Sequence, residues 1–158
     1  MDIRGILKQV DVFYEENRGE QAEKLMQESI LQAVHEQDDE SLLQLLNELL
    51  GYYRETSQTE NAHRIGEQAI AQAVRMGLEG TFPYATTMLN VANARRAAGE
   101  LQESLEYYLQ VQALYKKLLT PDNIFIAGLE NNMSLLYQEM GEYAKAKQCQ
   151  LKALEIVR

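Results

Sequence analysis

The chain has 158 residues, of which 46% are hydrophobic and 25% are charged, and its formal net charge is −9. This length and hydrophobic content suit one folded domain with a sizeable core and exclude a disordered chain. Residues 1–40 hold 11 acids against 4 bases, and the rest of the chain holds 13 against 11. We interpret the acidic N-terminal part as a solvated helix surface or as an attraction for a basic partner. We expect no nucleic-acid partner, because phosphate neutralisation needs clustered Lys and Arg.

The number of cysteines and the hydropathy of the sequence indicate the cellular compartment of the protein. Cys149 is the only cysteine, so an intrachain disulfide is excluded. The N-terminus does not resemble a signal peptide, and no run approaches the roughly 18 apolar residues of a membrane span. We therefore expect a cytoplasmic protein with no membrane partner.

The sequence predicts an all-α fold. Leu, Ala, Glu and Gln dominate, and strand-like alternation is nearly absent. Apolar residues recur at helical spacing in eight segments. The first predicted helix covers about residues 2–17 and is followed by a turn at Gly19. The second ends in the polar stretch 36–39, where Asp38 or Asp39 can cap the third helix.

Turn residues punctuate the second half of the chain in the same way. The fifth predicted helix starts near Pro83 and ends at Gly99, and Gly141 separates the last two helices. Thr120 and Pro121 are typical of an N-cap followed by proline at the first helical position. They predict that the seventh helix begins at residue 121.

The chain also repeats itself with a period of 42 residues. The dipeptide Gly-Glu at 99–100 recurs at 141–142, and Ser57 occupies the glycine position of a weaker upstream copy. The first copy is spaced nearer 40. Such self-similarity is typical of stacked helical units. We predict one domain over residues 1–158, with four helix pairs at about 2–38, 39–78, 82–119 and 121–158.

Small residues share one register in these copies. Ala62, Ser104 and Ala146 follow one another at 42-residue intervals. We predict that they lie where two helices cross, because a larger side chain there would push the helices apart.

These motifs resemble the tetratricopeptide repeat. Residues 127–156 carry Tyr137 on the first helix, a Gly-Glu-Tyr turn, and spaced alanines on the second helix. Residues 85–114 match through a Gly-Glu-Leu turn at 99–101, and the two upstream copies match more loosely. The 42-residue period is similar to the long repeats of kinesin light chains and related bacterial repeat proteins, and exceeds the usual period of about 34. The frequent aromatic residue early in the first helix is missing, since Leu46, Met88 and Glu130 stand there.

The resemblance implies a right-handed α-solenoid of about four antiparallel helix pairs, with the first helix of each pair on a concave face. Asparagine can bind a peptide main chain as donor and acceptor, and arginine can hold a carboxylate. Alternatively, the asparagines bond to neighbouring helices and the arginines pair with glutamates such as Glu48 and Glu55. The candidate peptide-binding residues are Asn47, Arg54, Asn90, Asn93, Arg96, Asn131, Asn132 and Gln138.

Catalytic signals are poor. His35 and His63 lie on different predicted helices without metal-ligand companions, and no glycine-rich phosphate loop is present. We therefore expect no enzymatic activity, no cofactor and no metal. The expected function is that of a scaffold or adaptor that binds a protein or peptide segment.

Two other functions stay open. The resemblance also suggests a peptide-sensing regulatory domain of a larger bacterial regulator. The apolar residues Leu151, Leu154 and Val157 of the last helix have no element after them. The interspersed polar residues of this helix could make it its own cap. We favour a fragment of a longer repeat array or a self-associating module that forms a homodimer through this end.

Overall fold

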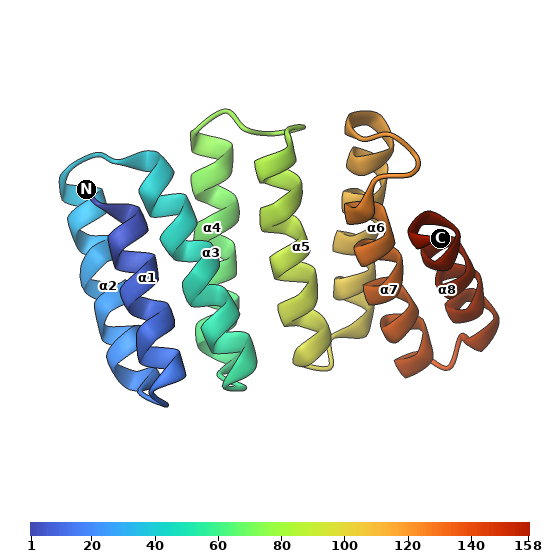
Figure 1. Ribbon diagram of the computed structural model, residues 1–158, viewed down its shortest axis with the longest axis horizontal. Coiled ribbons are helices and arrows are strands. Elements are labelled where there is room, and N and C mark those ends of the chain that lie inside the picture. Colours follow the sequence, from blue (N-terminus) through green and yellow to red (C-terminus); the bar gives the residue numbers. More distant parts are fainter. The chain divides into compact units, whose positions relative to one another are not determined.

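The computed structural model describes all 158 residues, which form eight α-helices and no strand. The chain divides into two compact units, Met1–Gly77 (unit 1) and Leu78–Arg158 (unit 2). The all-α fold class is confirmed. Unit 1 contains α1 (Ile3–Glu15), α2 (Gly19–His35), α3 (Asp39–Glu55) and α4 (Thr59–Arg75). Unit 2 contains α5 (Phe82–Ala97), α6 (Leu101–Leu118), α7 (Ile124–Glu139) and α8 (Tyr143–Val157) (Figure 1).

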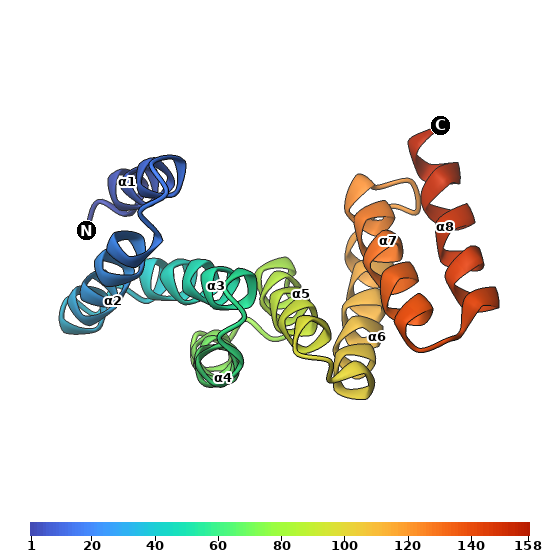
Figure 2. The same ribbon diagram turned by 90° about the horizontal axis from the view of Figure 1, so that it is seen from below.

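Consecutive helices pack against each other within each unit. Contacts join α1 to α2, α2 to α3 and α3 to α4 in unit 1, and α5 to α6, α6 to α7 and α7 to α8 in unit 2. Figure 2 shows the antiparallel course of α7 and α8. No helix combines the length and the hydrophobicity that crossing a bilayer requires. That the four pairs together make one domain stays a prediction.

The two helices of each pair are joined by a tight turn around one residue with positive φ. Asn17, Ser57, Gly99 and Gly141 hold this position, with φ of 58°, 58°, 80° and 80°. The next backbone N–H donates to the carbonyl five residues earlier, as in Glu142 N to Tyr137 O at 2.8 Å. This closure is a Schellman motif, which needs a left-handed residue at its corner. Ser57 therefore does the work of glycine, as its place in the repeat predicted.

The predicted small residues are buried. Ala62, Ser104 and Ala146 are at most 5% exposed. The Ser104 hydroxyl donates to the carbonyl oxygen of Ala92 at 2.7 Å. It thus joins α6 to α5 by a hydrogen bond inside the helix crossing.

The structure identifies the residues that cap the N-termini of α3 and α7. Asp38 caps α3, since its Oδ1 accepts from the backbone N–H of Ser41 at 3.2 Å. The prediction that the seventh helix begins at residue 121 was wrong, because α7 begins at Ile124. Asn123 is the cap, and its Oδ1 accepts from the backbone N–H of Phe125 at 2.9 Å. Thr120 instead donates to the Asp122 carboxylate at 2.8 Å, which uses its hydroxyl within the turn.

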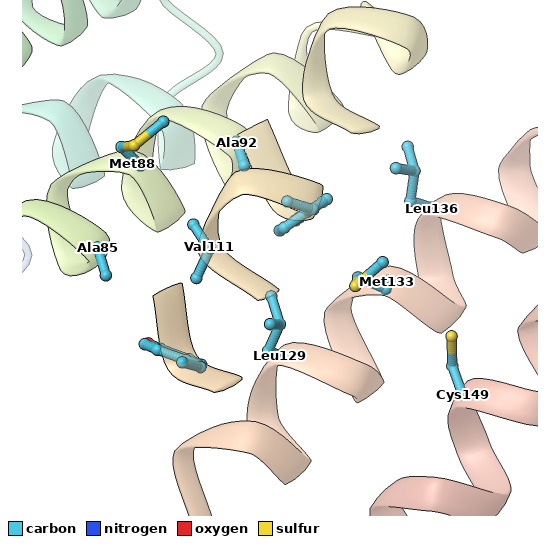
Figure 3. Packing of buried hydrophobic residues seen from close by; sticks show 10 residues of the cluster. Ala85, Met88, Ala92, Val111, Leu129, Met133, Leu136 and Cys149 are labelled. Carbon is cyan, nitrogen blue, oxygen red and sulfur yellow. The ribbon is translucent and has the colours of Figure 1, made fainter. Parts of the chain in front are cut away.

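The core of unit 2 is centred on one face of α6. Tyr108, Val111 and Tyr115 are buried there, together with apolar residues of the other three helices. Figure 3 shows Met88 of α5 on one side and Met133 of α7 on the other. The α7 helix is therefore held by apolar side chains of α6 and by Cys149 of α8, which belongs to the same cluster.

Replacing glycine by alanine should have opposite effects on stability at two positions of unit 2. A Cβ at Gly128, inside α7, or at Gly141, in the turn, would meet no atom within 4 Å. Gly128→Ala should raise the free energy of unfolding by about 0.5–1 kcal/mol through helix propensity. Gly141→Ala should lower it by about 1–2 kcal/mol, because φ is +80° there. Urea denaturation of both variants checks this, and shifts of the same sign would contradict it.

Candidate functional site

The predicted peptide-binding residues of unit 1 lie on α3. Asn47 and Arg54 are half-buried. The Asn47 side chain donates to the Leu43 carbonyl of its own helix at 3.2 Å, and Arg54 forms an ion pair with Glu55 at 3.5 Å. The expectation that an arginine could pair with a nearby glutamate is therefore met at Arg54.

Acidic and aromatic residues of α1 and α3 also lie close together in unit 1, and none of them is among the candidate residues. The rings of Tyr14 and Tyr52 stack with centroids 6.1 Å apart. Burial, followed by the negative charges of Glu48 and Glu55, raises the pKa of Tyr14 to about 12. Burial, followed by the charges of Asp11 and Glu55, raises the pKa of Glu48. The carboxylates of α1 and α3 thus gather around the tyrosine pair.

Two of the three candidates on α5, Asn93 and Arg96, are connected through one side chain of α6. The Tyr108 hydroxyl of α6 donates to Asn93 Oδ1 and accepts from Arg96 Nε at 3.3 Å. Arg96 Nη1 lies 3.4 Å from the Glu139 carboxylate, so the guanidinium links α5 to α7. Asn90, one turn earlier, is half-buried and engaged within the chain.

The candidates on α7 are more open. Asn131 and Gln138 are exposed, and Asn132 is half-buried. Asn131 and Gln138 lie seven residues apart on one helix, so they share a face. Arg96 therefore connects the helix of the α5 candidates to that of the α7 candidates, through Glu139, which is not itself a candidate.

A cavity in unit 2 was missed by the sequence analysis. Its volume is about 490 Å³, and it lies between α6 and α7, with Pro121 of their connection and Lys152 of α8 in its wall. Most of the lining is apolar, but Glu130 belongs to it as well. Such a volume falls within the range of small-molecule sites.

Glu130 is a buried carboxylate that is incompletely bonded. It is 3% exposed, and its Oε1 accepts from Gln112 Nε2 at 3.2 Å. Its Oε2 has no hydrogen-bond partner. An unmade hydrogen bond at a buried acceptor costs about 1–3 kcal/mol. In α8, burial, followed by a hydrogen bond to the Glu130 side chain and by its negative charge, raises the pKa of the Cys149 thiol to about 12.

Sequence comparison identifies the repeat in unit 2. Residues 83–158 match the family model of the tetratricopeptide repeat. The predicted resemblance is confirmed. None of the curated proteins compared with the chain matches it.

Solved structures extend the likeness to the whole fold. BtubC (BKLC) from P. vanneervenii superposes with a TM-score of 0.87 at 22% identity, over 98% of this chain and 61% of that one. The nearly identical TPR-like repeats of a Podosopora anserina kinesin light chain candidate give TM-scores of 0.80, for a single-substitution variant, and 0.77. Both match at 20% identity over 98% of this chain and 74% of theirs. The chain thus spans about three fifths of BtubC, and these likenesses show the tetratricopeptide-like repeat fold.

Within the 42-residue repeat of this chain, the position of Glu130 is a core position. Leu46 and Met88 stand 84 and 42 residues before it, and each is 2% exposed. The 42-residue register was the signal that could have identified Glu130 as a buried acid. Its neighbours at α6 and α8 were not deducible from that register.

We predict that Glu130→Met stabilises the protein. Methionine fills the equivalent place at Met88, and replacing a buried, incompletely paired charge with an apolar side chain should raise the free energy of unfolding by about 1–3 kcal/mol. Urea denaturation measures the change, and Met88→Glu, the reverse exchange at the same register, should be strongly destabilising. A destabilised Glu130→Met variant would show that the carboxylate is fully satisfied in solution.

Proposed function

We propose that the chain is a scaffold that binds a protein or peptide segment through the first helices of its pairs. Tetratricopeptide repeats generally mediate protein interactions. The observation that carries the finer proposal is a repeated stripe on these helices, at spacings of four and three residues. The stripe is Asn47, Gly51 and Arg54 on α3, Leu89, Asn93 and Arg96 on α5, and Asn131, Leu135 and Gln138 on α7.

Residues at these spacings share one face of a helix. On α7 the stripe is exposed throughout, and an apolar side chain, Leu135, lies between two amides. Each amide offers donors and an acceptor to the main chain of an extended peptide. Leu135, at 45% exposure, offers apolar area to one of its side chains.

On α5 the polar side chains of the stripe are held in place before any ligand arrives. The Tyr108 hydroxyl bonds to both Asn93 and Arg96, and Glu139 approaches the other side of the guanidinium. Fixing side chains in advance reduces the entropy lost on binding. An arginine has five N–H donors, so Arg96 can keep both contacts and still meet an acidic group.

If the proposed surface binds the partner, substitutions on the α7 stripe should weaken binding and substitutions on other faces should not. Asn131→Ala/Leu135→Ala/Gln138→Ala should weaken binding of a captured partner at least tenfold, because it removes the α7 stripe without touching the core. Pull-down from a lysate of the source cell identifies the partner, and calorimetry with the purified partner then measures its affinity.

The matched control replaces three exposed residues of α6, Gln102, Glu106 and Gln110, by alanine. Its affinity should stay within twofold of the parent, and circular dichroism should show both variants to be folded. Equal affinities for the parent and the α7 variant would move binding away from this stripe.

A second function, self-association, is favoured by the surface of α8. Four of its apolar residues are between 48% and 71% exposed, namely Tyr143, Leu151, Leu154 and Val157. Leu151, Leu154 and Val157 follow one another at three-residue spacing, so they lie along one side of the helix. We propose that this side pairs with its counterpart on a second copy as a twofold contact.

Self-association predicts a sedimentation coefficient that rises with protein concentration. Leu151→Ala/Leu154→Ala should weaken the dimer at least tenfold, because it removes apolar area at the centre of the contact. Lys147→Ala/Gln148→Ala, at exposed polar positions of the same helix, is the control and should behave as the parent. A parent that stays monomeric at the highest attainable concentration would refute the contact.

A further inference from the structure

The cavity of unit 2 is a candidate for a second binding site. Its lining contains none of the stripe residues of α5 or α7. It therefore belongs to a different surface from the proposed peptide site, and the two can be tested separately.

The buried acid defines what the cavity can recognise. Glu130 lines the wall, and its Oε2 has no partner while Oε1 accepts from Gln112. Rotation about the last bond of a glutamate side chain is broad, with two nearly equivalent positions. A donor entering the cavity can thus take one carboxylate oxygen while Gln112 keeps the other. An ammonium group is the strongest such donor, because the hydrogen bond is charge-assisted.

Two lysines that also line the cavity restrict the charge of the ligand further. Lys116 of α6 and Lys152 of α8 both line the cavity and are exposed. A simple amine would meet Glu130 but would be repelled by the two lysines. A simple carboxylate would meet the lysines but would be repelled by Glu130. A ligand that carries an ammonium group and a carboxylate on the same carbon atom satisfies all three side chains.

The remaining wall is apolar. Leu109 of α6 and Ile126 and Leu129 of α7 supply much of it. An aliphatic or aromatic side chain would bury its surface against them, which adds a favourable term proportional to its area.

From these charges and contacts, we propose that the cavity binds a free hydrophobic α-amino acid. Its ammonium group donates to Glu130, its carboxylate faces Lys116 and Lys152, and its side chain lies against Leu129 and Ile126. In this site the incomplete bonding of Glu130 is completed by the ligand.

Calorimetry on the full chain tests the proposal with L-leucine and its two truncated analogues. Leucine should bind with a dissociation constant in the millimolar range or below. Isoamylamine lacks the carboxylate and 4-methylpentanoate lacks the ammonium group, and each should bind at least tenfold more weakly. Absence of leucine binding at millimolar concentration would overturn the proposal, as would an analogue that binds as tightly as leucine.

Variants locate the binding. Glu130→Gln keeps the shape of the side chain and removes its charge, and it should weaken leucine binding at least tenfold. Lys152→Gln changes an exposed residue that leaves the core intact, so it tests the same site without a folding risk and should also weaken binding. Lys147→Gln, on α8 but outside the cavity wall, is the control and should bind as the parent. Unchanged affinity in both Glu130→Gln and Lys152→Gln would place leucine elsewhere and refute the site.

The triple variant of the α7 stripe separates this site from the proposed peptide surface. It should lose the protein partner and keep leucine, because none of its three residues lines the cavity. Loss of leucine in this folded variant would contradict the assignment to the cavity.

Discussion

The helix pairs of both units depend on one backbone constraint, the left-handed residue at each reversal. Asn17, Ser57, Gly99 and Gly141 close the same Schellman geometry, in which the following N–H reaches back five residues. This closure sets the point at which the second helix leaves the first, and it therefore sets which residues meet at the crossing. Small residues such as Ser104 are required at that point. Further along the same pair, Tyr108 of α6 reaches Asn93 and Arg96 of the α5 stripe. The candidate binding surface thus follows from the turn.

Most of the fold could be predicted from the sequence because it is local and repeated. Helical periodicity marks eight segments, and the 42-residue register places Ser57 in the same left-handed turn as Gly99. The start of α7 could not be found in this way. Thr120 and Asn123 are both good caps, and the choice depends on the Thr120–Asp122 hydrogen bond in a connection of irregular shape. Local propensity cannot rank two caps three residues apart.

The sequence could predict which helices carry the candidate residues, but not which side chains those residues contact. The repeat places Asn93 and Arg96 on the expected helix, yet their engagement with Tyr108 and Glu139 depends on residues 12 to 43 positions away, on two other helices. For the same reason the cavity was missed, since its wall combines α6, α7 and α8. A sequence register can show that Glu130 stands in a core position. It cannot show that Gln112 partners one oxygen and that the other is left over.

The proposed peptide surface and the proposed cavity site differ in their effect on the stability of the fold. The exposed amides of Asn131 and Gln138 remain hydrated when no ligand is bound, so they are nearly neutral for stability and are compatible with many surfaces. Glu130 is different, because a carboxylate at an apolar register position sacrifices stability in every molecule, whether or not a ligand is present. Positions where a chain departs from its own pattern at such a cost are concentrated at functional sites. In this chain the departure at Glu130 coincides with a cavity whose wall also carries Lys116 and Lys152, so the cost in stability falls where a small molecule with both charges would bind.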